Sequence, residues 1–332
     1  MQLIISRLAS LFILIAVGYF AGKIKMLTSD GVKTLSKIVL NVSTPCLVLG
    51  SVLGDTGSIM GSGTGYFLLL TLLAYVLFFI IAIPSARLLG LRNSEFGIRN
   101  AELDSLMQDS TQKSELHNKS GALNSGLYTA LIVFGNVGFM GFPVAGAIFG
   151  SESLFYVALF NILFQLIVFS AGIIMISGKG AKLDFKVLLN PAFFCSIVAI
   201  TVIFTGFQTP SLIAETISLV GGINTPCAMF IIGATLAQTP LKGIFVKWRL
   251  YPMAVLKLVA IPVVTWLIFS QFVTDEWLLG ILVLLSSMPT AASVSMIAIE
   301  YGGDRHMASG GVFISTLLSG VTITLVVYLF LM

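Results

Sequence analysis

The chain has 332 residues, of which 57% are hydrophobic and only 10% are charged, with a formal net charge of +4 and a mean hydropathy of +1.03. A soluble domain carries roughly 25% charged residues, so a water-soluble fold of this length could not bury so much apolar surface. The composition therefore excludes an ordinary soluble protein and indicates an all-α integral membrane protein.

Windows of about 20 apolar residues, the length that crosses a hydrocarbon core, predict ten transmembrane helices. The first five lie at 3–21, 33–53, 64–90, 124–149 and 152–177. The second five lie at 189–206, 211–238, 249–272, 276–300 and 305–331. The polar segment 91–122, between the third and fourth helices, is expected to form a cytosolic loop.

Positive charge is distributed unevenly between the connections of these ten helices. All but two of the 18 lysines and arginines fall on one side of the membrane; the exceptions are Arg7 and Lys257, and Lys257 lies inside a predicted span. Lysine and arginine accumulate on the cytoplasmic side, so both termini are expected outside. The predicted location is the plasma or inner membrane, crossed many times.

The two halves of the chain are predicted to be related. With five helices in each half, residues 178–332 enter the membrane from the side opposite to residues 1–177, which is the condition for an inverted repeat. The second helix carries Asn-Val-Ser-Thr-Pro-Cys from Asn41, and the seventh carries Asn-Thr-Pro-Cys from Asn224. A shared proline motif in matching helices supports the repeat.

The fourth and ninth helices are both broken. The fourth contains GNVGFMGFP from Gly135 to Pro143, and the ninth contains SSMPT from Ser286 to Thr290, with Pro289 inside it. Proline removes a backbone donor and glycine unwinds at low steric cost, so two such helices in matching positions predict a binding site near the membrane midplane. Both prolines suit the first turn of a second half-helix, whose free amides and positive dipole end favour an anion. The alternative is a pair of ordinary proline kinks.

A resemblance to a known family is carried by three segments, GNVGFMGFPVAGAIFG at 135–150, SSMPTAASVSMIAIEYGGD at 286–304 and NVSTPCLVLGSVL at 41–53. They resemble the auxin efflux carrier family, which includes bacterial malate and malonate permeases and plant auxin exporters. The resemblance implies two inverted five-helix repeats in which broken helices 4 and 9 cross, as in sodium/proton antiporters and bile acid transporters. It also implies a scaffold of helices 1, 2, 6 and 7 and a mobile transport domain of helices 3–5 and 8–10.

The resemblance also implies site residues. In the plant carriers an asparagine stands a few residues before the helix-4 crossover proline and contacts the substrate carboxylate, and Asn136 occupies that place here. Polar residues of helices 2 and 5 line the family's site, and their counterparts are Ser43, Thr44, Asn161 and Gln165. The full predicted substrate-binding set is Asn136, Pro143, Pro289, Thr290, Ser43, Thr44, Asn161, Gln165 and Lys257.

Lys257 is the one clear charge within a predicted span. One interpretation is a counter-ion for a substrate carboxylate or for another protein group. The alternative is a lysine that snorkels toward the membrane surface from the side of Arg249. No aspartate or glutamate lies deep in a predicted span, so a paired-aspartate cation antiport mechanism finds no support.

Catalytic, cofactor and metal sites are not expected. Cys46, Cys195 and Cys227 form no CxxC pair, His117 and His306 lie in loops, and HExxH and nucleotide-binding motifs do not occur. The sequence is therefore interpreted as that of a transporter and not an enzyme, with no cofactor and no nucleic-acid partner.

The predicted function is secondary transport of small organic anions, carboxylates such as malate, malonate or auxin-like acids, by alternating access of the elevator type. One alternative is a sodium- or proton-coupled symporter of the bile acid transporter type, and another is a non-transporting membrane receptor or channel-like protein. The expected partners are a small organic anion, the lipid bilayer and a second copy of the chain in a homodimer through the scaffold helices.

Overall fold

The computed structural model describes residues 2–50, 53, 63–91, 125–177, 191–205, 209–238, 245, 247–300 and 304–330. Within these ranges the chain is helical, and its β-pairing is confined to one antiparallel bridge between Gly135 and Thr290. The helical class predicted from composition is confirmed for this part of the chain. Nearly all of the predicted cytosolic loop 91–122 lies outside the described residues, so the loop stays a prediction.

In the first half the α-helices are α1 (Gln2–Lys23), α2 (Ser29–Ile38), α3 (Thr44–Gly50), α4 (Gly63–Leu91), a helix at 125–133, α7 (Phe142–Phe149), α8 (Ser153–Ile167) and α9 (Ile173–Ser177). In the second half they are α10 (Pro191–Thr205), α11 (Ser211–Gly222), α12 (Asn224–Gln238), α13 (Leu250–Val255), α14 (Ile261–Phe269), α15 (Glu276–Ser286), α16 (Ala292–Glu300) and α17 (Arg305–Phe330). Four π-helical turns extend these helices: η1 (Val39–Ser43), η4 (Val137–Gly141), η5 (Val168–Gly172) and η7 (Leu256–Ala260).

Six of the described helical stretches are long and apolar enough to cross a membrane. They are Ser29–Gly50, Gly63–Leu88, Ser153–Ile176, Ser211–Gln238, Leu250–Phe269 and Met307–Phe330. Shorter apolar helices lie at Ala9–Lys23, Val137–Phe149 and Glu276–Ser286. The chain is therefore a multi-pass membrane protein, whereas the count of ten spans and the inverted repeat stay predictions.

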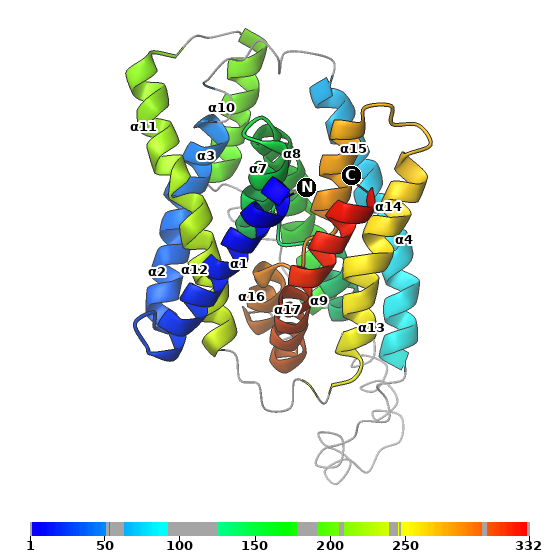
Figure 1. The fold of residues 1–332 in the computed structure, drawn as a ribbon. Helices are drawn as coiled ribbons and strands as arrows, with labels where there is room; N and C mark the ends of the chain where they lie inside the picture. The colour runs from blue at the N-terminus through cyan, green and yellow to red at the C-terminus, as the bar shows by residue number, and fades with distance from the viewer. Residues whose placement is uncertain are drawn as a thin grey trace, which may run out of the picture.

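The helices form two groups (Figure 1). One contains α2, α3, α10, α11 and α12; the other contains α4 and α13 to α17, with α7, α8 and α9 toward the middle. Helix α1 runs along α12 at close range, because a Cβ on Gly18 would come 2.6 Å from the backbone of Phe230 and one on Gly233 would overlap the carbonyl of Ile15. Small residues allow this approach of two backbones, as is common between membrane helices.

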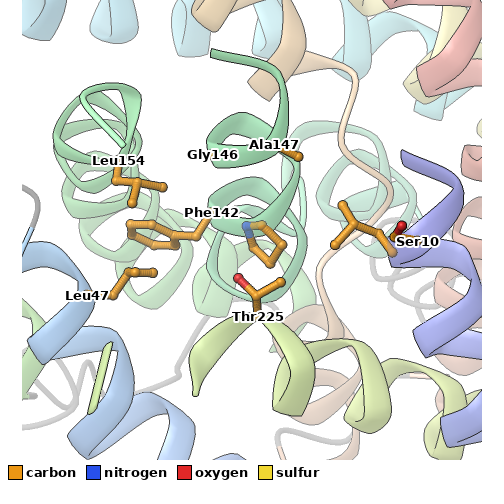
Figure 2. A pocket seen from close by; sticks show the side chains of 9 residues that line it. Ser10, Leu47, Phe142, Gly146, Ala147, Leu154 and Thr225 are labelled. Atoms are coloured by element: carbon orange, nitrogen blue, oxygen red, sulfur yellow. The ribbon is translucent and has the colours of Figure 1, made fainter. Parts of the chain in front are cut away.

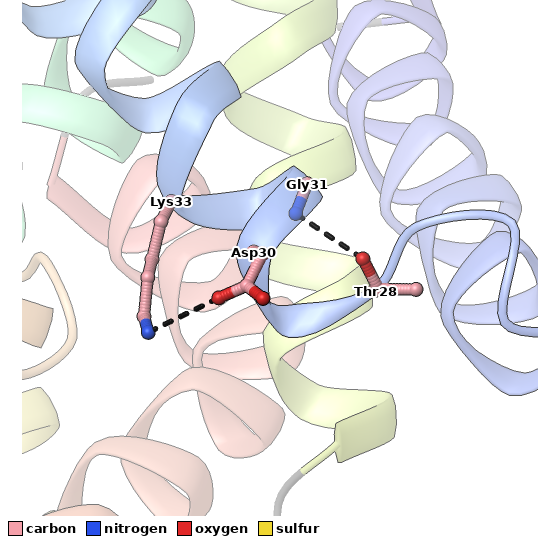
Figure 3. A network of polar contacts seen from close by, with 4 residues as sticks. All are labelled: Thr28, Asp30, Gly31 and Lys33. Carbon is pink, nitrogen blue, oxygen red and sulfur yellow. Dashed lines mark hydrogen bonds and ion pairs between the residues drawn. The ribbon is translucent and has the colours of Figure 1, made fainter.

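The start of α2 illustrates how the polar end of the molecule is built (Figure 3). The Thr28 hydroxyl oxygen accepts a hydrogen bond from the Gly31 amide at 3.3 Å and caps the helix, and Lys33 pairs with Asp30 at 3.3 Å. Both partners of this ion pair are exposed, so the pair contributes little to stability. Helices α1 and α12 end at the same end of the molecule (Figure 1), so these charges lie away from the apolar middle.

Three of the four π-helical turns have one cause in the sequence. Turns η1, η4 and η7 each end two residues before a proline, namely Pro45, Pro143 and Pro262. Proline lacks an N–H and its ring clashes with the carbonyl four residues back, so the turn before it widens. The widened hydrogen bonds run from Thr44 N to Val39 O, from Phe142 N to Val137 O and from Ile261 N to Leu256 O. The prolines thereby decide where these membrane helices depart from α-geometry.

Candidate functional site

The breaks of the predicted fourth and ninth helices lie side by side in the structure. Gly135 pairs with Thr290 in the antiparallel bridge, the Asn136 amide donates to the Pro289 carbonyl at 2.6 Å, and the Ala291 amide donates to the Phe134 carbonyl at 2.9 Å. We call this pairing of 134–136 with 289–291 the crossover. Every residue in it is buried, which satisfies the rule that extended backbone at membrane depth must be enclosed by protein.

Asn136 stands at the start of the helix that leaves the crossover. Its Oδ1 accepts a hydrogen bond from the Phe139 amide at 3.2 Å, so Asn136 is the N-cap of η4. Its side chain is 5% exposed, and its Nδ2 group has no hydrogen-bond partner among the described residues. Asn161 of α8 is 7% exposed, and its Oδ1 lies near Gly138 in the first turn after the cap. Two predicted asparagines therefore face the same helix start, and Gln165 follows one turn later on α8.

The two crossover prolines are placed differently from each other. Pro143 lies in the first turn of α7, as predicted, but the half-helix already begins at Val137. The Val137 amide donates to the Gly135 carbonyl and the Phe139 amide to Asn136 Oδ1, so the Gly138 amide is the one in this first turn that has no hydrogen-bond partner among the described residues. The prediction that Pro289 starts a half-helix is wrong, because α16 begins only at Ala292. Pro289 lies between α15 and α16, and its carbonyl accepts the hydrogen bond from the Asn136 amide.

Ser43 and Thr44 lie at a contact between helices. The Ser43 hydroxyl donates to the Val220 carbonyl at 3.0 Å, and the Asn224 side-chain amide donates to the Thr44 hydroxyl oxygen at 2.7 Å. Both predicted residues are buried between α3 and the α11–α12 pair, where a Cβ on Gly221 would come 2.9 Å from the Leu47 backbone. The two proline motifs thus pack against each other.

Thr290 also has a structural partner. Its hydroxyl donates to the Leu131 carbonyl at 2.7 Å, and its amide donates to the Ser315 hydroxyl oxygen at 3.1 Å. Because Leu131 belongs to the last turn of the helix at 125–133, Thr290 satisfies a carbonyl that the helix end leaves unpaired. Thr290 and Ser315 fix the crossover to its neighbours.

Lys257 does not snorkel, so that alternative is wrong. Its side chain is 1% exposed, and its ammonium lies 3.4 Å from the Val133 carbonyl and 3.5 Å from the Ser286 carbonyl. It also lies 5.8 Å from the ring centre of Phe78. The widened turn η7, caused by Pro262, carries Lys257 and directs it inward to the crossover. Its predicted direct contact with a substrate stays untested.

A cavity of about 290 Å³ adjoins the helix that Asn136 caps (Figure 2). Its lining residues come from α1, α3 and α12 on one side and from α7 and α8 on the other: Ser10, Leu11, Leu47, Phe142, Pro143, Gly146, Ala147, Leu154 and Thr225. Figure 2 shows the Thr225 hydroxyl between the two sides, and this hydroxyl has no hydrogen-bond partner among the described residues. Apart from Ser10 and Thr225, the described walls are apolar.

Sequence reasoning missed the polar residues of this cavity. Thr225 belongs to the proline motif of the seventh helix, and that motif indicated a repeat without indicating a cavity. Ser10 carried no signal, because a serine on a membrane helix usually bonds within its own helix. The Ser10 hydroxyl does donate to the Ser6 carbonyl at 2.9 Å. Of the predicted residues, Pro143 is the one that lines the cavity.

Apolar helices that meet at a buried break, beside a cavity walled by two helix groups, define a multi-pass membrane protein of the transporter class. The family model described as "Membrane transport protein" matches residues 3–107, 119–187 and 183–327, so the chain belongs to this family. The resemblance to auxin efflux carriers is confirmed, as is the interpretation as a transporter and not an enzyme.

Individual relatives carry similar names. The chain is 30% identical over 207 residues to a protein of Rhizobium meliloti (strain 1021) named "Putative malonate transporter", a match that covers 59% of this chain and 64% of that protein. It is 26% identical over 321 residues to an uncharacterized transporter of Methanothermobacter thermautotrophicus, covering 95% of each chain. It is 24% identical over 324 residues to an uncharacterized transporter of Methanocaldococcus jannaschii, covering 94% of each.

Proposed function

We propose that the protein is a secondary carrier of small organic anions, with short dicarboxylates of the malonate type as the first substrates to test. The observation that carries this proposal is the helix start at Asn136, which is buried and leaves the Nδ2 group of its cap residue unbonded among the described residues. A helix start carries about half a unit of positive charge and free amides, both of which favour an anion. The name of the rhizobial relative supports malonate as the first choice.

The anion would be held mainly by neutral donors. The candidates are the Asn136 side-chain amide, the Gly138 amide of η4, and the Thr225 hydroxyl in the adjoining cavity. A hydrogen bond to a charged acceptor is worth about 1.5–3 kcal/mol, so two or three such donors are enough for binding in the micromolar to millimolar range. Asn161, which faces the same helix start, is placed to orient the Asn136 region.

The position of the cavity supports alternating access of the elevator type. Its walls come from α1, α3 and α12, in the predicted scaffold, and from α7 and α8, in the predicted transport domain. A sliding boundary between two groups is best served by apolar walls with few hydrogen bonds across them, and the described walls have this character. The proposal includes a plasma- or inner-membrane location with both termini outside and a homodimer formed through the scaffold helices.

The test of the site compares Asn136→Asp with Asn136→Ala. A carboxylate at position 136 keeps the acceptor for the Phe139 amide, so the melting temperature should stay near that of wild type, while the negative charge repels an anion. We expect malonate affinity, measured by calorimetry on purified protein, to fall about 10- to 150-fold in Asn136→Ala and further in Asn136→Asp.

The matched control is Asn41→Asp, because Asn41 is exposed and its amide donates to the Lys37 carbonyl of its own helix. This variant should bind malonate like wild type. Unchanged affinity in both Asn136 variants would remove Asn136 from the site and leave the crossover as a purely structural kink.

Transport itself is tested with labelled malonate in proteoliposomes. A carrier gives saturable uptake and accelerated exchange against unlabelled malonate inside, whereas a channel-like protein gives flux without counterflow. Uptake that requires an imposed sodium or proton gradient would select the symporter alternative. Absence of any malonate-specific flux, across a panel that includes malate and auxin-like acids, would contradict the proposed function.

A further inference from the structure

Lys257 is a buried cation whose partners are backbone groups. No carboxylate of the described residues lies within ion-pair distance of its ammonium, and the side chain is 1% exposed. An isolated ammonium in a membrane interior is costly unless other groups replace its water shell. The groups that do so are the Val133 and Ser286 carbonyls, at 3.4 and 3.5 Å, and the face of Phe78.

Both carbonyls occupy equivalent places in the two broken helices. Val133 is the last residue of the helix at 125–133, and Ser286 is the last residue of α15. Each of these helices ends at the crossover, and a helix end leaves its last four carbonyls without partners inside the helix. Lys257 therefore reaches the carbonyl ends of two helices that are more than 140 residues apart in sequence.

The neighbouring carbonyls have other donors. Leu131 O accepts from the Thr290 hydroxyl, Phe134 O from the Ala291 amide, and Leu285 O from the Met288 amide. The Val133 and Ser286 carbonyls have Lys257 as their recorded side-chain donor. The ammonium thus supplies, at both ends, the donor that the crossover backbone does not supply.

We propose that Lys257 is a positioning residue that neutralises the carbonyl ends of both half-helices. An anion at Asn136 is then not repelled by the partial negative charge of these two ends. Each helix end carries about half a unit of negative charge, and the single ammonium offsets the two together. Gly135 permits this placement, since a Cβ there would come 3.2 Å from the ammonium nitrogen. The effect on anion binding rests on the proposed function; the effect on the protein without substrate does not.

The substrate-free protein separates this role from that of a substrate counter-ion. A counter-ion waiting for a substrate is a buried charge without compensation, so its removal should leave the substrate-free protein as stable or make it more stable. If Lys257 instead caps two helix ends, its removal should make the substrate-free protein less stable, because two buried carbonyls lose their partner.

The experiment measures melting temperature in detergent without substrate for wild type, Lys257→Met and Lys257→Arg. Met keeps the length and apolar stem, and Arg keeps the charge and adds donors. We expect Lys257→Met to melt about 5–10 °C lower, and Lys257→Arg to recover at least half of that loss. If the Met variant does not accumulate in cells but the Arg variant does, this also shows that the positive charge at position 257 stabilises the protein.

Malonate binding to the same three proteins supplies the functional readout. We expect Lys257→Met to weaken binding about tenfold, equivalent to 1.4 kcal/mol, and Lys257→Arg to restore it. Equal losses of stability in the Met and Arg variants would show that packing and not charge matters at this position, and would overturn the proposal. So would a Met variant at least as stable as wild type. If wild type binds no malonate, the proposed function fails, while the melting temperatures still decide the role of Lys257.

Discussion

At the scale of single residues, the close contact between α1 and α12 depends on glycine. A methyl group at Gly233 would overlap the Ile15 carbonyl, whereas at Gly222, exposed at the end of α11, it would meet no atom within 4 Å. We expect Gly233→Ala to lower the unfolding free energy by about 1–3 kcal/mol because the helices must separate. Gly222→Ala should be neutral or slightly stabilising, and equal melting temperatures for the two variants would contradict this account.

The hydroxyl of Thr290 gives a second prediction at this scale. Thr290→Val keeps the shape but removes the 2.7 Å bond to the Leu131 carbonyl, which lies on a different helix. Thr265→Val is the matched control, because Thr265 is equally buried but donates to the Ile261 carbonyl of its own helix. We expect a loss of about 1–2 kcal/mol at position 290 and clearly less at position 265, measured by thermal or denaturant unfolding.

At the scale of whole elements, the prolines act through the π-helical turns that they impose. Pro262 follows η7, which carries Lys257, whereas Pro84 lies within α4, which has no π-helical turn. Replacing Pro262 by Ala lets turn η7 tighten to α-geometry and rotates Lys257 by about 100° relative to α14, which follows it. The ammonium then leaves the Val133 and Ser286 carbonyls.

Replacing each of these two prolines by alanine should therefore change the melting temperature in opposite directions. Pro84→Ala restores a missing helical hydrogen bond at an exposed position and should raise the melting temperature or leave it unchanged. Pro262→Ala should lower it and should weaken malonate binding. A rise in melting temperature in both variants would mean that η7 is not needed to place Lys257.

At the scale of the whole molecule, the positively charged residues lie near helix ends that share one end of the molecule. Helices α1, α4 and α12 end, and α2 and α13 begin, at one end of the molecule (Figure 1), and lysines and arginines gather around these ends in the sequence. We expect a cysteine at Lys23 to react only from the cytosolic side and one at Ser151 only from outside. The measurement uses a membrane-impermeant maleimide on intact cells, in a background without Cys46, Cys195 and Cys227. External labelling at position 23 would overturn the predicted orientation.

The features that could be predicted from the sequence are local ones. Apolar length identifies a membrane helix, because the hydrocarbon core requires it of each segment separately. A missing N–H likewise breaks the hydrogen bonding of its own helix, so Pro143 and the stretch around Pro289 were recognised as sites of interruption. Asn136 was singled out by its place a few residues before Pro143, which resembles the auxin efflux carrier motif, whereas its capping of η4 is known from the structure.

Which groups contact each other depends on how the helices pack. The pairing of Asn136 with Pro289 joins residues 153 positions apart, and no local pattern specifies the partner of an unpaired carbonyl. The same holds for Lys257, whose sequence context allowed a surface-seeking side chain but whose helix faces two buried helix ends. Ser43, Thr44 and Thr290 form hydrogen bonds with residues far away in the sequence, namely Val220, Asn224 and Leu131. Ser10 and Thr225 line the cavity, on α1 and α12, which pack closely through glycine. Polar groups within the membrane cannot bond to water, so each must bond to another protein group. The long-range packing of the helices therefore determines which partner it has.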